Sequence, residues 1–285
     1  MRIKSILMCA VLTAGMLFTG CNNNSDSSGE NSGTSSSTGG AGSADLTNFA
    51  GNTVEVSPKE GDLVAAFEIE DYGTIYAVLF PEAAPVGVEN FQKLCEAGYY
   101  KGLKIHRVKK DFMFQGGSLN GDGTGGDALV NGGSFGIEVN DNLRHFYGAL
   151  CYANAAGQNS TQFYIVNNKV YDPAEDIKVV EERLAEVREL LKQAESDSQA
   201  DAVEYYKAYE EAYAKLLETL PSYSGRGGYP SLDGSYTVFG QVYDGFDVIE
   251  SISAVDVEMG SDGAMSKPVQ DIIIENVYIS KYVEG

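Results

Sequence analysis

Tryptophan is absent from this 285-residue sequence, and histidine and basic residues are scarce. Two histidines, His106 and His145, leave almost no material for a histidine metal cluster or a serine triad, so neither a metal nor a cofactor is expected. Lysine and arginine number 20 against 41 acidic residues, which gives a formal net charge of −21. Nucleic acid is therefore excluded as a partner, because phosphate binding requires clustered lysine and arginine.

Cysteine is also rare, and its four positions do not form a disulfide framework. Cys9 lies in an apolar leader and Cys21 directly follows it. Cys95 in an expected helix and Cys151 in an expected strand should be buried thiols that pack as small apolar residues. Whether these two pair depends on their separation, which the sequence does not give.

The N-terminus has the features of a secretory leader. A short basic head precedes an apolar stretch, Ile6 to Phe18, that is too short to span a bilayer comfortably. The following Thr19-Gly20-Cys21 resembles a bacterial lipobox, although Phe18 stands where leucine is usual. We expect residues 1–20 to be a lipoprotein signal peptide and Cys21 to be lipidated, which would anchor the protein to the membrane. The alternative is an ordinary secretory signal with an incidental cysteine.

The next segment, residues 21–57, is dominated by Ser, Gly and Asn. Such a composition cannot bury enough apolar surface to offset the entropy of ordering, so we expect a flexible tether. Residues 58–285 would then form a single domain on the extracytoplasmic side of a bacterial cell membrane, attached by its lipid.

The segment Ile105–Gly117 places an arginine, large apolar side chains and an amide on two expected adjacent strands. Its spacing, Arg-x4-Phe-Met-x-Gln-Gly-Gly, resembles the signature of cyclophilins, the peptidyl-prolyl cis/trans isomerases. Further segments resemble the family's motifs in the same order, which makes chance resemblance improbable. These segments are Thr74–Phe80, Ala84–Phe91, Gly123–Gly126, Leu150–Ala155, Thr161–Ile165 and Leu232–Val242.

The resemblance implies that Arg107 donates a hydrogen bond to the prolyl nitrogen, with Phe112 and Gln115 as its catalytic partners. Amide resonance gives rotation about the prolyl bond a barrier of about 18–20 kcal/mol. A donor to the prolyl nitrogen weakens this resonance and so lowers the barrier. Arginine suits this role because it stays charged and offers donors in a fixed plane. The alternative for this stretch alone is an ordinary strand pair with Arg107 on its rim. The implied substrate-binding residues are Met113, Ala153, Asn154, Ala155, Gln162, Tyr164, Leu232 and Tyr236.

Within that set, the resemblance implies that Gln162 supports Arg107 or Gln115, and that Asn154 acts mostly through its peptide groups. Three positions depart from the family's usual residues. They are Ser231 for a groove tryptophan, Tyr236 for a pocket histidine and Tyr164 for a phenylalanine. None replaces Arg107, so we expect activity, whereas cyclosporin-type ligands should bind weakly.

The expected fold is mainly β. Short runs rich in Val, Ile, Phe and Tyr, bounded by Gly, Asn and Asp, predict antiparallel strands. Val86–Ala97 and Asp244–Ala254 have helical spacing, and Gln270–Tyr282 reads as a closing strand. Together with the resemblance, these elements predict a closed antiparallel cyclophilin-like β-barrel capped by two helices.

Residues from about 172 to 222 interrupt this pattern where the family is expected to have a short connection. Apolar residues recur at three- and four-residue steps on both sides of a polar break at Ser196–Gln199, which predicts an inserted α-helical hairpin. The insertion is either a self-packed surface elaboration or one wall of the substrate groove. Removing it between Val170 and Gly227 is expected to leave a folded barrel.

Two functions from different classes follow from this sequence. The first is a peptidyl-prolyl isomerase that assists the folding of secreted or cell-envelope proteins, with proline-containing peptides and unfolded secreted proteins as partners. The second is a peptide-binding or chaperone module with little turnover, which uses the same groove together with the helical insertion.

Overall fold

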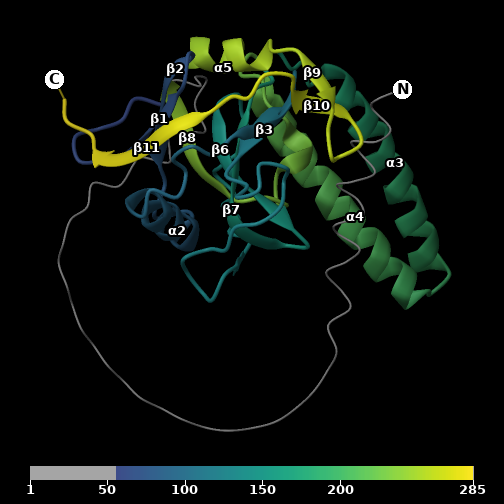
Figure 1. Ribbon diagram of the computed structural model, residues 1–285. Helices are drawn as coiled ribbons and strands as arrows, with labels where there is room; N and C mark the ends of the chain where they lie inside the picture. The colour runs from purple at the N-terminus through teal and green to yellow at the C-terminus, as the bar shows by residue number, and fades with distance from the viewer. Residues whose placement is uncertain (1–55, 285) are drawn as a thin grey trace, which may run out of the picture.

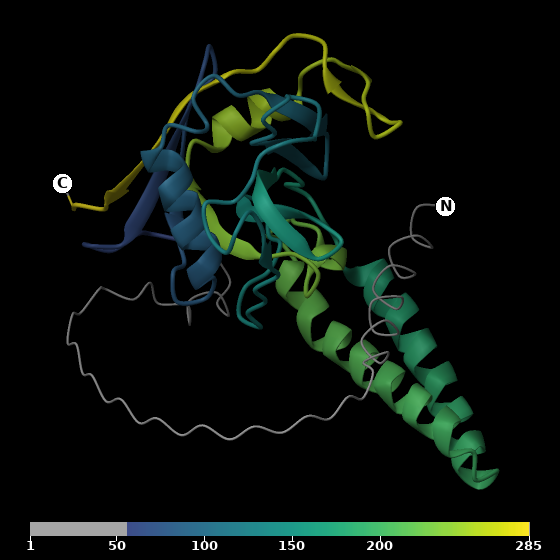
Figure 2. The same cartoon turned by 60° about the horizontal axis from the view of Figure 1, so that its bottom comes forward.

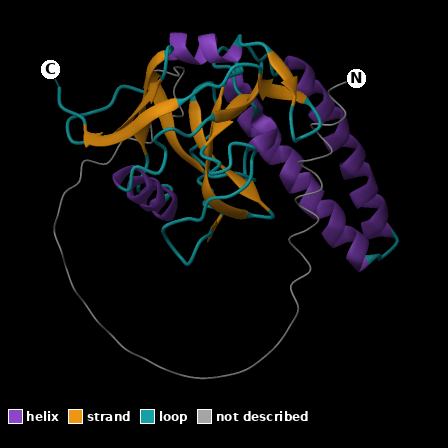
Figure 3. Ribbon diagram, in the orientation of Figure 1, coloured by secondary structure: helices purple, strands orange, loops and turns teal. Residues whose placement is uncertain are grey.

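The computed structural model describes residues 56–284, which form a mainly β domain with a long helical arm (Figures 1 and 3). The strands are β1 (Leu63–Ile69), β2 (Gly73–Leu79), β3 (Ile105–Lys109), β4 (Met113–Gly116), β5 (Phe135–Gly136), β6 (Ala149–Ala155), β7 (Gln158–Val166), β8 (Val238–Asp244), β9 (Val257–Met259), β10 (Met265–Pro268) and β11 (Ile274–Lys281). The helices are α2 (Pro85–Glu96), α3 (Ala174–Ser196), α4 (Ala200–Thr219) and α5 (Phe246–Ser253), with 3-10 turns η2 (Leu220–Tyr223) and η3 (Pro230–Leu232). The predicted signal peptide, Cys21 and nearly all of the predicted tether lie outside the described residues.

Nine strands form one curled antiparallel sheet in the order β11-β1-β2-β8-β6-β7-β4-β3, with β5 paired to β7. The mainly β fold class is confirmed, but the expected full closure of the barrel is wrong. At the seam, the bridge between Lys104 and Ile273 and three backbone hydrogen bonds of 2.8–2.9 Å join residues 102–105 to residues 272–274. Along the rest of its length β3 pairs with β4 alone among the named strands, so closure of the barrel is partial.

Alternate strand residues feed two apolar clusters on opposite faces of the sheet, as the two-residue period of a strand requires. The helix-side cluster is built around Phe91 of α2, whose ring lies 5.2–5.7 Å from the rings of Phe67, Tyr100 and Phe239. The loop-side cluster has Met113, Cys151 and Tyr164 among its buried members, on the face that carries most of the predicted pocket residues. On β7, Phe163 therefore points to the first cluster and Tyr164 to the second.

Helices α3 and α4 form an antiparallel hairpin that projects from the barrel (Figure 2). The hairpin has its own core of Val180, Leu184, Tyr213 and Leu220, as its two apolar stripes predict. None of the helices within residues 56–284 has both the length and the apolar character needed to cross a bilayer.

The base of the hairpin is fixed to the barrel by a pair of hydrogen bonds. Gly228 N donates to Asn168 O at 2.7 Å, and Asn168 Nδ2 donates to Gly228 O at 2.8 Å. Only glycine fits at position 228, because φ is +117° and a Cβ atom would lie 2.4 Å from His145 O. The chain therefore leaves the barrel after β7 and returns beside the loop that carries η3.

Candidate active site

Arg107 lies on β3, where the strand register sets it opposite Gln115 of β4. Its Nη1 donates to Gln115 Oε1 at 3.2 Å and lies 3.7 Å from Met113 Sδ. The guanidinium carbon is 5.9 Å from the centroid of the Phe112 ring. Because the Arg107 side chain is 25% exposed, its guanidinium stands at the rim of the loop-side cluster and remains accessible from solvent.

A line of amides continues from Arg107 to the glycine-rich loop formed by residues 121–126. Gln115 Nε2 donates to Gln162 Oε1 at 2.9 Å, and Gln162 Nε2 donates to Gly123 O at 2.9 Å. Of the two roles left open by the sequence, Gln162 therefore supports Gln115 directly. Since both amides are engaged, Gln115 can present a fixed oxygen to the guanidinium.

The predicted proline pocket gathers on the loop side of the sheet. Met113 and Tyr164 are buried there, and the partly buried Phe112, Ala153, Leu232 and Tyr236 pack against them. The position of Phe112 is set by its backbone. Its N donates to Asn167 Oδ1 at 2.8 Å, while Asn167 N donates to Phe112 O at 3.1 Å. Asn167, which directly follows β7, thus holds the backbone of Phe112 in place.

A buried polar group supports the pocket from beneath. His145 is 1% exposed, and its ring stacks with that of Tyr164 at a centroid distance of 6.2 Å. Asp233 Oδ1 accepts from His145 N at 3.0 Å and lies 2.8 Å from His145 Nδ1. Tyr223, at the end of the insertion, donates to Asp233 Oδ2 at 2.7 Å. Because Asp233 follows Leu232 directly, these bonds fix one wall of the pocket.

The comparisons with known proteins address this arrangement. Residues 64–279 match the family model described as "Cyclophilin type peptidyl-prolyl cis-trans isomerase/CLD". The chain belongs to the cyclophilin family. Its enzyme class is therefore peptidyl-prolyl cis-trans isomerase.

Similar bacterial cyclophilins carry corresponding names. A "Putative peptidyl-prolyl cis-trans isomerase" of Staphylococcus haemolyticus is 36% identical over 200 residues, which cover 70% of this chain and 82% of that protein. A "Putative bifunctional phosphatase/peptidyl-prolyl cis-trans isomerase" of Streptococcus pyogenes serotype M6 is 32% identical over 238 residues. That match covers 82% of this chain but 40% of the streptococcal protein, so the phosphatase named there belongs to that protein.

Solved structures agree in fold. A Cryptosporidium parvum cyclophilin type peptidyl-prolyl cis-trans isomerase superposes with a TM-score of 0.53 at 21% identity, covering 78% of this chain and 99% of that one. The same protein in the presence of the dipeptide ala-pro gives a TM-score of 0.52 at 22% identity, with coverages of 77% and 99%. At these identities the likeness concerns the fold alone.

The cyclophilin motif Ala153-Asn154-Ala155 lies at the end of β6, and its members differ in environment. Ala153 packs on the loop-side cluster, whereas Ala155 is exposed and pairs with Gln158. The side chain of Asn154 is used structurally, since Nδ2 donates to Ser235 O at 3.0 Å and Oδ1 accepts from Gly157 N at 3.3 Å. A role in substrate binding through the peptide groups of Asn154 stays a prediction.

Two residues of this cyclophilin site were not predicted from the sequence. Tyr229, which returns from the insertion, packs on Phe112 with ring centroids 4.5 Å apart. Asp262, in the turn between β9 and β10, accepts from Arg107 Nε at 2.9 Å. Neither residue belongs to a matched motif, although the Gly227-Gly228 pair could have indicated a close approach of the chain just before Tyr229.

The charges of the site are set by burial and by ion pairing. Burial, together with the charge of Arg107, lowers the pKa of His106 to about 4, so this imidazole is neutral near pH 7. Burial alone would raise the pKa of Asp262, but hydrogen bonds from Ser266 and Arg107 outweigh it and hold that pKa well below its usual range. Burial raises the pKa of Tyr164 far above neutrality. Near pH 7 the Arg107 guanidinium therefore faces an ionised Asp262, with a neutral His106 beside it in sequence.

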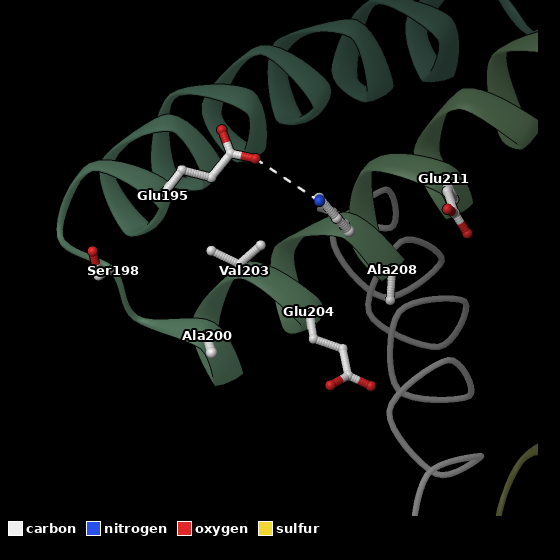
Figure 4. Close-up of a pocket in the computed structure, with 8 residues that line it drawn as sticks. Glu195, Ser198, Ala200, Val203, Glu204, Ala208 and Glu211 are labelled. Atoms are coloured by element: carbon white, nitrogen blue, oxygen red, sulfur yellow. Dashed lines mark ion pairs between the residues drawn. The ribbon is translucent and has the colours of Figure 1, made fainter.

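Elsewhere the described residues offer no comparable chemistry. No group of histidine, cysteine and acidic residues suited to a metal occurs among residues 56–284. A hollow of about 620 Å³ lies at the hairpin tip, crossed by an ion pair between Lys207 and Glu195 (Figure 4). Its walls are short or charged side chains on one surface of the arm.

Cys95 and Cys151 are free thiols, which answers the question of pairing that the sequence left open.

Proposed function

We propose that this cyclophilin isomerises prolyl bonds by donation from Arg107 to the prolyl nitrogen. The observation that carries the proposal is the position of the guanidinium, held by Gln115 at 3.2 Å on the rim of an apolar pocket. The related Cryptosporidium structure determined in the presence of the dipeptide ala-pro supports a substrate of this class. The ring would occupy the space between Phe112, Met113 and Leu232.

In this mechanism the protein supplies geometry and a fixed dipole. As the carbonyl before proline turns out of the amide plane, the nitrogen lone pair localises and becomes a better acceptor. A preorganised donor aimed at that nitrogen is stronger in the transition state than in either ground state, so it accelerates the reaction in both directions. No nucleophile or proton relay is needed.

A protease-coupled assay on a short Xaa-Pro peptide tests the role of Arg107. Arg107→Ala should lower kcat/KM by an amount that corresponds to about 2–4 kcal/mol of transition-state stabilisation, the size of losing one preorganised donor. Arg107→Lys should restore only part of the rate, because lysine keeps the charge without the planar donor set. Lys101→Ala, an exposed cation in the preceding loop, is the matched control. A wild-type rate in Arg107→Ala would overturn the mechanism.

The cellular setting proposed is the outer surface of a bacterial membrane, with lipid on Cys21. What supports this is the sequence of the N-terminus, with its basic head, apolar stretch and lipobox-like Thr19-Gly20-Cys21. Unfolded secreted proteins would be the natural clients there, since uncatalysed prolyl isomerisation takes tens to hundreds of seconds.

Metabolic labelling with a radioactive fatty acid tests the anchor. The full chain expressed in a bacterium should incorporate label and sediment with membranes, whereas Cys21→Ala should lose both properties. Labelling that persists in Cys21→Ala would exclude lipidation at this cysteine. Release of an unlabelled wild-type protein into the medium would favour the ordinary secretory signal.

A further inference from the structure

We infer that Asp262 is a positioning residue that fixes the guanidinium of Arg107 for prolyl isomerisation, an inference that rests on the function proposed above. The contact joins residues 155 positions apart, so it is a product of the fold. Asp262 Oδ2 accepts from Arg107 Nε at 2.9 Å. Both side chains are about three-quarters covered, at 25% and 26% exposed, which limits screening by solvent.

The carboxylate and Gln115 take different edges of the guanidinium. Asp262 binds the Nε edge and Gln115 binds Nη1, so two acceptors on two separate elements define the plane of the group. A plane defined in this way cannot rotate about the Cδ–Nε or Nε–Cζ bond without breaking a charge-assisted hydrogen bond. In the described contacts Nη2 is left for the substrate, and its direction is then fixed before the peptide arrives.

Asp262 is itself held rigidly by its turn. Its Oδ1 accepts from Ala264 N at 3.0 Å and from Ser266 Oγ at 2.7 Å, and Ser266 is 2% exposed. The neighbouring Ser261 Oγ donates to Asp122 O at 2.8 Å, which ties the turn to the glycine-rich loop. Oδ1 therefore anchors the carboxylate while Oδ2 is directed at Arg107.

Lys109 is the second cation on this carboxylate, with its Nζ at 3.5 Å from Asp262 Oδ2. It lies two residues beyond Arg107 on β3 and so shares its face of the strand. The longer distance makes Lys109 the weaker partner, and Asp262 is shared unequally in favour of Arg107. Removing Lys109 should therefore leave the geometry of Arg107 intact.

The experiment compares Asp262→Asn and Asp262→Ala with wild type and with Asp271→Asn. Asparagine keeps an oxygen for Ala264 and Ser266, so it tests the carboxylate without dismantling the turn. Asp271 pairs with Lys104 at 2.6 Å in the same part of the chain and controls for loss of one charge. Both Asp262 variants should lower kcat for a short Xaa-Pro peptide by about tenfold with little change in KM, since misplacement of a catalytic group by 1 Å can cost up to 10²-fold.

A direct readout comes from the Nε–H signal of Arg107 in ¹⁵N NMR spectra of the same proteins. Its proton should exchange slowly with water in wild type and Asp271→Asn, and at least several-fold faster in Asp262→Asn. Unchanged kcat and unchanged exchange in Asp262→Asn would overturn the inference, even with an inactive Arg107→Ala. A fully active Arg107→Ala would instead overturn the proposed function, so the two failures are distinguishable.

Discussion

Tyr229 packs on Phe112 at 4.5 Å and belongs to the neighbours of the loop-side cluster. Ser231 stands where cyclophilins usually have a groove tryptophan. Two residues earlier, at the return of the insertion, Tyr229 brings an aromatic ring onto Phe112. An aromatic pair of this kind contributes about 0.5–1.5 kcal/mol beyond its buried area.

Tyr229→Ala should therefore weaken the binding of a proline peptide. The fall in kcat/KM should correspond to about 1–2 kcal/mol and appear mainly as a higher KM, because a pocket wall would contact the substrate equally in the ground and transition states. Steady-state kinetics on an Xaa-Pro peptide would measure it, with the exposed Tyr278→Ala as control. A loss confined to kcat would place Tyr229 in the chemical step and contradict its role as a wall.

His106 should make the stability of the folded domain depend on pH. Its folded-state pKa is about 4, against an ordinary value of 6.5, so the unfolded chain binds the proton first as pH falls. The contribution of His106 to stability is full above about pH 6.5 and is lost as pH falls towards 4. The isomerisation rate should stay nearly flat from about pH 5.5 to 8.5, because Asp262 remains ionised and His106 mostly neutral.

Urea unfolding of wild type and His106→Gln across pH 4 to 7.5 checks the stability effect. The variant should show a shallower fall in its unfolding midpoint between about pH 6.5 and 4, because glutamine cannot take up the proton. If the unfolding midpoints of the two proteins fell in parallel with pH, His106 would not contribute to the pH dependence of stability.

Among single residues, the sequence indicated the site residues that lie in the ordered motifs. It did not indicate residues that only the fold brings to the site. Arg107, Gln115 and Gln162 form one hydrogen-bonded line, and Met113 and Tyr164 share one cluster, as the motifs imply. Asp262 had no local pattern, since a carboxylate in a turn is usual on any surface. Its partner becomes visible only when β10 is laid beside β3.

At the scale of elements, periodicity placed the long helices closely. Helix α2 spans Pro85–Glu96 where Val86–Ala97 was predicted, and the polar break at Ser196–Gln199 separates α3 from α4. The short strands β5, β9 and β10 escaped prediction, because two to four residues carry too little pattern. The partial closure of the sheet was also missed, since it depends on how far β3 runs.

The base of the insertion changes where the arm can be cut. Tyr223 is fully buried, and its hydroxyl donates to Asp233. It therefore packs as part of the barrel, although in the sequence it lies within the insertion. A junction between Val170 and Gly227 would remove this support from beneath the pocket. Leu220, three residues earlier, belongs to the core of the hairpin instead. The boundary between arm and barrel thus lies within η2.

Tyr223→Phe should destabilise the domain by about 1.5–3 kcal/mol, the range for a hydrogen bond to a charged group. Replacing residues 175–219 with a short glycine linker, with Leu220→Ser added, should cost the barrel little, because the hairpin core is separate. Urea unfolding monitored by tyrosine fluorescence would compare both with wild type. If the short deletion fails to fold while Tyr223→Phe is neutral, the arm rather than its base supports the barrel.

At the scale of the whole molecule, the protein is a partly open cyclophilin barrel from which an acidic helical arm projects (Figure 2). The arm and the barrel have separate cores, and the pocket residues lie outside α3 and α4. Turnover of a short peptide should accordingly depend on the barrel, whereas any contribution of the arm would require a longer chain. This separation allows the isomerase to be distinguished from a binding module with little turnover.

Exchange NMR on a short Xaa-Pro peptide in the presence of a small amount of the protein tests the central claim most directly, because it reports binding and isomerisation in one sample. Cis–trans exchange cross-peaks that are absent for the peptide alone should appear, together with shifts of the Met113 and Leu232 methyl signals. Exchange should disappear in Arg107→Ala while those methyl shifts persist at higher peptide concentration. Methyl shifts in wild type without any acceleration of exchange would rule out catalysis of the prolyl rotation and identify the pocket as a binding site alone.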